Sequence, residues 1–142
     1  MRFGTQPGGY DTGVVEDETA GWDLPRDITA GAAARRHVAD FLSPSDPATL
    51  RESCELVASE LAVNAVRHGH PPARMSLRRE GHGIRIEVTS GLGTARPEFG
   101  ALEALDPESP NGRGLAIAAH LADDIGWTEI DGRITVWADI SG

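Results

Sequence analysis

The chain has no lysine, only one cysteine and no long hydrophobic run. All 13 basic residues are arginine, and we interpret the missing lysine as genomic composition rather than as chemistry. The single cysteine, Cys54, excludes an intramolecular disulfide and is predicted to be a small buried hydrophobe on a helix. No apolar stretch approaches the roughly 20 residues that a membrane span needs, and the N-terminus lacks the hydrophobic region of a signal peptide. We therefore expect a cytoplasmic protein without a membrane partner.

Positive charge is also scarce relative to negative charge, and the formal net charge is −9. This balance argues against nucleic acid as a direct partner, since phosphate backbones require a basic surface. It suits a basic protein partner, because long-range attraction between opposite charges would accelerate their encounter. The 142 residues predict one domain over 19–142, after a flexible tail over 1–18 that is rich in glycine and acidic residues.

The first half of the chain predicts a short edge strand near 21–24 and then two helices. Asp27 is expected to cap the first helix, which runs to about Leu42 and buries a face that begins with Ile28. Asp46 before a proline predicts the N-cap of a second, longer helix. This helix should end at Gly69, in the left-handed conformation, because two prolines follow it closely.

The second half predicts two strands over 73–80 and 84–89, then a long loop that we interpret as a lid over about 91–112. A third helix follows, and the last two strands form a hairpin across Asp131 and Gly132, a strong signal for a tight turn. This order predicts an α+β two-layer sandwich. Three helices should cover one face of a mixed, mostly antiparallel sheet.

The long helix carries the residues with the clearest chemical meaning. Glu60 and Asn64 lie one turn apart beside an apolar stripe, where desolvating a carboxylate and a carboxamide is costly unless they have partners. A hydrated cation with a phosphorylated ligand would supply such partners. The alternative is a pair on a solvated helix face, which is the commoner meaning of this spacing.

Two motifs resemble those of the histidine-kinase-like ATPase superfamily, and in particular its anti-sigma factor/serine kinase branch. Glu60-Leu61-x-x-Asn64-Ala65-x-x-His68-Gly69 resembles the N-box, and Gly112-Arg113-Gly114-Leu115 resembles the second glycine box. Glycines at the start of a helix let the backbone approach phosphates, toward which the first amides point.

The first glycine box departs from the family pattern. In that pattern an aspartate accepts a hydrogen bond from the adenine amino group, and glycines follow it. Here Ser90 stands at the aspartate position, and Gly91 and Gly93 are one residue out of register. A serine hydroxyl can accept the same bond but lacks the charge that strengthens it.

The resemblance implies the Bergerat fold with ATP and Mg²⁺ bound between the long helix, the lid and the third helix. Asn64 would hold magnesium, and Glu60 would accept the proton of an attacking serine hydroxyl. Ser90, Gly91, Gly93 and the residues 112–115 would contact the nucleotide. Arg113 would reach a phosphate or remain a surface charge, and His68 would contact the ligand or pack at the helix end.

The implied function is to sequester a sigma factor and to phosphorylate a serine on an anti-anti-sigma factor. A homodimer is one of the assemblies that the resemblance leaves open. The alternative is a non-catalytic relative that acts only by protein binding, which Ser90 favours. A two-component histidine kinase is a poorer interpretation, because no helix with a phosphoacceptor histidine is recognisable.

Overall fold

Five strands form one sheet in the order β1-β2-β3-β5-β4, and every neighbouring pair is antiparallel. The computed structural model describes residues 18–93, 96–97, 99 and 113–142, so the predicted tail and most of the predicted lid lie outside the described residues. The strands are β1 (Thr19–Asp23), β2 (His70–Glu80), β3 (Gly83–Gly91), β4 (Asp124–Ile130) and β5 (Arg133–Ser141).

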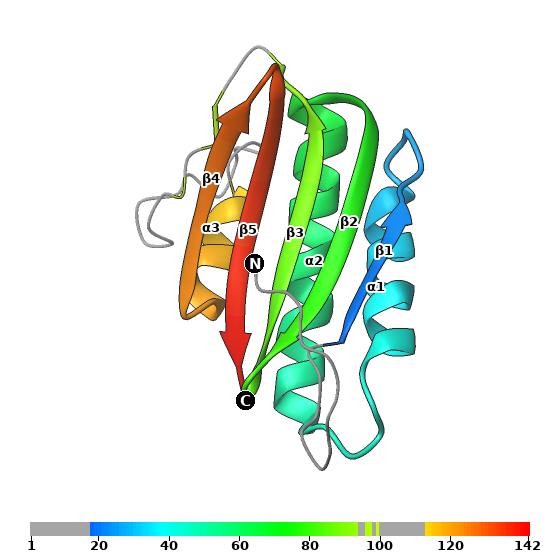
Figure 1. The fold of residues 1–142 in the computed structure, drawn as a ribbon, viewed down its shortest axis with the longest axis vertical. Helices are drawn as coiled ribbons and strands as arrows, with labels where there is room; N and C mark the ends of the chain where they lie inside the picture. The colour runs from blue at the N-terminus through cyan, green and yellow to red at the C-terminus, as the bar shows by residue number, and fades with distance from the viewer. Residues whose placement is uncertain (1–17, 94–95, 98, 100–112) are drawn as a thin grey trace, which may run out of the picture.

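Three helices cover one face of this sheet, as Figure 1 shows. They are α1 (Ala30–Phe41), α2 (Ala48–His68) and α3 (Arg113–Leu121). The predicted two-layer α+β sandwich is therefore confirmed, with a sheet that is antiparallel throughout its described pairings. Within the described ranges, no helix is long and apolar enough to cross a membrane.

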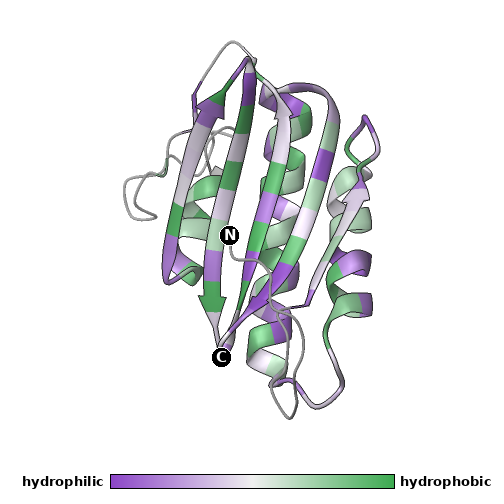
Figure 2. Cartoon of the chain, viewed as in Figure 1, coloured by the Kyte–Doolittle hydropathy of each residue, from purple (hydrophilic) through white to green (hydrophobic). Residues whose placement is uncertain are grey.

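The strands alternate between buried and half-exposed residues, which Figure 2 shows as changes of colour along β3 and β5. Residues of even number on these strands face the helices, because side chains alternate between the two faces of a sheet. The β4–β5 hairpin turns at Asp131 (φ 54°) and Gly132 (φ 76°), the left-handed pair that a two-residue turn requires. The hairpin prediction is confirmed.

The hydrophobic core lies between α2 and the inner face of the sheet. Its largest fully buried side chains include Leu61 on α2, Met75 and Leu77 on β2, and Ile86 on β3. Cys54 is also fully buried on α2, and burial raises the pKa of its thiol to about 12. The expectation of a small buried hydrophobe at Cys54 is confirmed.

The start of α1 differs from the prediction. Its N-cap is Thr29, without a side-chain capping bond, and the Asp27 carboxylate instead accepts a hydrogen bond from the Thr29 amide at 3.0 Å, before the helix begins. Ile28 was expected on the buried face, yet 64% of it is exposed. Because the helix begins only at Ala30, the period of 3.6 residues does not extend back to Ile28.

The start of α2 also differs. Pro47 is its N-cap, and the Asp46 carboxylate points to β2, where Arg79 donates two hydrogen bonds of 3.0 and 3.1 Å. The predicted capping role of Asp46 is wrong because a cation distant in sequence competes for its oxygens. Asp46 instead connects the α1–α2 loop to the sheet.

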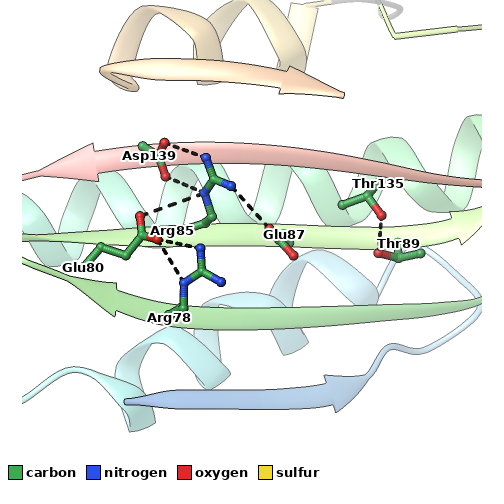
Figure 3. Close-up of polar contacts among 7 residues, drawn as sticks. All are labelled: Arg78, Glu80, Arg85, Glu87, Thr89, Thr135 and Asp139. Carbon is green, nitrogen blue, oxygen red and sulfur yellow. Dashed lines mark hydrogen bonds and ion pairs between the residues drawn. The ribbon is translucent and has the colours of Figure 1, made fainter. Parts of the chain in front are cut away.

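The face of the sheet opposite the helices carries paired charges (Figure 3). Arg85 donates two hydrogen bonds to Asp139, at 2.8 and 2.9 Å, which raise its pKa, and its guanidinium lies 4.4 Å from the ring centroid of Trp137. Glu80 accepts hydrogen bonds from Arg78 on β2. These charges satisfy one another, so this face offers little free charge for a ligand.

Candidate functional site

The acidic and amide residues of the N-box-like motif lie at the border of the buried face of α2. Glu60, Asn64 and His68 follow at four-residue steps and are all partly exposed, whereas Leu61 and Ala65 beside them are buried. Three polar side chains thus form a row along the helix. The core fixes this row, since the buried residues decide how α2 is rotated against the sheet.

Glu60 lies directly against the first turn of α3. A Cβ atom placed on Gly114 would come within 3.2 Å of the Glu60 Cδ and nearer still to Oε1, so a side chain there would require the Glu60 carboxylate to move. The two predicted motifs, separated by a long loop in the sequence, therefore meet at this contact. The absence of a side chain on Gly114 allows this approach, and the Glu60 carboxylate lies near the start of a helix, where negative charge is favoured.

A second close contact joins the end of α2 to the end of β3. A Cβ on Gly69 would collide with the Ser90 Oγ and lie 2.9 Å from the Ala65 carbonyl oxygen. Gly69 has φ −103° and ψ −171°, which is extended, so the predicted left-handed conformation is wrong. Glycine is needed at this position for space.

The chain leaving β3 passes over the same helix end. A Cβ on Gly93 would overlap the carbonyl oxygen of His68, and the Leu92 amide donates a hydrogen bond of 2.9 Å to the Gly132 carbonyl in the β4–β5 turn. The approach of Gly93 to His68 was not predicted. Its only signal in the sequence is the repeated glycine of Gly91-Leu92-Gly93.

The structure therefore brings together most, but not all, of the predicted site. Glu60 meets Gly114, and the end of α2 meets Ser90, Gly91 and Gly93. Leu115 packs its side chain in the hydrophobic core. Gly112 and the side chain of Arg113 lie outside the described residues.

The row of Glu60, Asn64 and His68 offers a metal ion few oxygen donors. Within 18–93, 96–97, 99 and 113–142, no group of three or more histidine, cysteine or acidic side chains could hold a metal ion. Magnesium commonly takes one or two protein oxygens and completes its shell with water and substrate phosphates. The Asn64 carboxamide, one turn from Glu60, can supply such an oxygen.

Comparison with known proteins adds a family and a fold. The sequence matches the family described as "Histidine kinase-like ATPase domain" over residues 24–139. No curated protein sequence matches it. A similar solved structure is that of the RsbU and RsbW domains of Rv1364c from Mycobacterium tuberculosis, with a TM-score of 0.63 and 17% identity. The match covers 87% of this chain and 32% of that chain, so this chain spans about a third of its length.

Proposed function

The chain belongs to the histidine kinase-like ATPase family, and from this membership we propose that it is an ATP- and Mg²⁺-binding regulator of the anti-sigma factor type. In this proposal it sequesters a sigma factor and transfers a phosphoryl group to a serine of an anti-anti-sigma factor. The resemblance of both motifs to that branch supports the assignment, and the named RsbW domain of the similar structure is consistent with it.

The observation that carries the proposal is the contact between Glu60 and Gly114. In it a carboxylate lies beside the start of α3, and a carboxamide follows one turn later on α2. Each matches a different need of phosphoryl transfer: a proton acceptor, a metal ligand and a set of amides for phosphate oxygens.

The roles of these residues follow from their chemistry. Bound Mg-ATP would supply the phosphoryl group and neutralise its charge. The Asn64 carboxamide oxygen would hold the metal, and the first amides of α3 would donate to the phosphates, which Gly114 would allow to approach. Glu60 would accept the proton of the serine hydroxyl while the serine oxygen bonds to the γ-phosphorus. The bond between that phosphorus and the oxygen of ADP breaks in the same step.

A partner-binding protein without kinase activity is the second candidate, and Ser90 favours it. The position carries no carboxylate, so a charge-assisted hydrogen bond to a nucleobase is absent. In that case Glu60 has a structural role, as an acid that stabilises the N-terminus of α3. Regulation would then depend on competition between protein partners alone.

Calorimetric titration of ATP, with and without magnesium, distinguishes the two candidates. We expect micromolar binding that depends on magnesium, and we expect Asn64→Ala to abolish that dependence, because the metal loses its protein ligand. Glu52→Ala, on the exposed side of the same helix, is the matched control and should bind like the wild type. Unchanged Mg-ATP affinity in Asn64→Ala would refute the metal role. Absence of binding at millimolar ATP would favour the partner-binding protein.

A further inference from the structure

The Ser90 hydroxyl is buried and has no hydrogen-bond partner among the described residues. Only 2% of Ser90 is exposed, and it faces the helical layer on β3, in line with Val88 and Ile86. Burying a hydroxyl is unfavourable unless it is hydrogen-bonded, and most such groups in proteins do have a partner. A buried hydroxyl beside the two closest backbone approaches of the site, at Gly69 and Gly93, is therefore a candidate for a ligand contact.

The two ends of the site lie at different positions along α2. At one end Glu60 contacts Gly114 of α3, and at the other end Gly69 contacts Ser90 of β3. Glu60 and Gly69 are nine positions apart on or next to α2, which corresponds to about 13 Å along a helix. This is comparable with the distance from the terminal phosphate to the base edge of an extended nucleoside triphosphate. With phosphates at α3, the base would reach the end of β3 (Figure 1).

We propose that Ser90 reads the base and makes the site accept guanine as well as adenine nucleotides. This inference rests on the proposed nucleotide binding. A hydroxyl can either donate or accept a hydrogen bond by rotating, whereas an ionised carboxylate can only accept. Adenine presents an exocyclic amine, a donor, where guanine presents a carbonyl, an acceptor. Ser90 can satisfy both, but a carboxylate at this position would repel the guanine carbonyl.

Equilibrium binding of Mg-ATP and Mg-GTP to the full chain tests the proposal. We expect the wild-type affinities for the two nucleotides to lie within about tenfold of each other. Ser90→Asp should keep ATP binding and weaken GTP binding by about 10- to 100-fold, because it fixes an acceptor against the guanine carbonyl. Ser90→Ala should weaken both by about fivefold, the worth of one net hydrogen bond.

The controls separate a base contact from a packing effect. Ser59→Ala removes another buried serine hydroxyl, on the side of α2 that packs on Gly31 of α1, and should leave both affinities unchanged. Thermal unfolding identifies any variant that fails to fold, and Ser90→Ala remains informative if Ser90→Asp does not fold.

Two results would overturn the proposal, and they differ. ATP binding with more than hundredfold discrimination against GTP, unaffected by Ser90→Ala, would refute base reading by Ser90 while leaving the proposed function intact. Absence of binding by both nucleotides would refute the proposed function and this inference together.

Discussion

Glu60 is subject to two demands, because its carboxylate packs on the first turn of α3 and the proposed reaction needs the same oxygens to accept a proton. A carboxylate near the start of a helix can also contribute to the stability of that helix. Whether Glu60 serves catalysis or the stability of α3 is therefore decided at one side chain. A substitution that keeps its shape and removes its charge separates the two roles.

We predict that Glu60→Gln keeps Mg-ATP binding and reduces phosphotransfer by about 10²- to 10⁴-fold, the usual contribution of a general base. The measurement is transfer of labelled phosphate from ATP to an anti-anti-sigma protein that carries the acceptor serine. Glu55→Gln, a partly exposed acid earlier on the same helix, serves as the control and should leave the rate unchanged. Transfer by Glu60→Gln at the wild-type rate would mean that another group accepts the proton.

Three glycines at the site occupy positions where little space is left for a Cβ atom. Gly69 and Gly114 each lie where a Cβ would strike a side-chain oxygen, and Gly93 lies where it would strike a carbonyl oxygen. None of these three has a positive φ, so the usual explanation of a turn glycine does not apply to them. The sequence shows a glycine, but only the structure shows which atom excludes the side chain.

Among the secondary-structure elements, α2 is fixed at its start by an ion pair. Asp46 and Arg79 join the α1–α2 loop to β2 with two hydrogen bonds, and the Asp46 side chain is only 14% exposed. The pair of Asp23 and Arg74 has a similar N–O distance, 3.1 Å, but 86% of the Asp23 side chain is exposed. The two pairs differ in burial and in the number of hydrogen bonds, since Arg74 donates only one to Asp23.

We predict that Asp46→Ala lowers the free energy of unfolding by about 2 kcal/mol, because it leaves Arg79 partly buried with fewer partners. Asp23→Ala should cause no measurable change, because water replaces the lost partner. Urea unfolding monitored by circular dichroism measures both. Equal losses in the two variants would contradict a special role for the Asp46 contact.

The same pair predicts how stability responds to acid. Hydrogen bonds from Arg79 hold the pKa of Asp46 below its ordinary value. The unfolded chain therefore binds more protons than the folded one in that range, so the stabilisation is complete above the unfolded pKa and is lost as the pH falls through the folded one. Asp46→Ala should remove this part of the acid dependence.

The ends of elements show what local sequence could and could not predict. The β4–β5 turn was predictable because Asp131 and Gly132 determine it by their own backbone preferences. The starts of α1 and α2 were not, because the oxygens of Asp27 and Asp46 bind other groups than the predicted helix amides. The Asp46 carboxylate binds Arg79 on β2 instead, and no local sequence pattern reveals a contact between residues so far apart in the chain.

The candidate site was predictable in its parts but not in its contacts. The motifs identified Glu60, Asn64 and the glycines near 114 as one site, and the structure places Glu60 against Gly114. The approach of Gly93 to the His68 carbonyl depends on how β3 ends beside α2. Such a distance results from packing of the whole sheet on the helices.

On the scale of the whole molecule, the two faces of the sheet have different tasks. The inner face packs on the helices and carries the core, whereas the outer face holds charges paired with one another. The candidate site lies at neither face alone, but along α2, from the contact of Glu60 with the start of α3 to the contact of Gly69 with the end of β3. Ligand binding there would connect elements from both halves of the chain and should stabilise the fold as a unit.

The buried Cys54 allows this coupling to be measured as a rate of thiol modification. The only thiol of the chain lies in the core, and burial keeps it protonated, so a thiol reagent should modify it only when the core opens. We predict that Mg-ATP at 100 times its Kd slows the modification about 100-fold, because a ligand bound only to the native state makes opening rarer by that factor. Unchanged labelling at saturating nucleotide would contradict the coupling. A single sulfur atom could thus report which nucleotides bind this protein, without any knowledge of its partners.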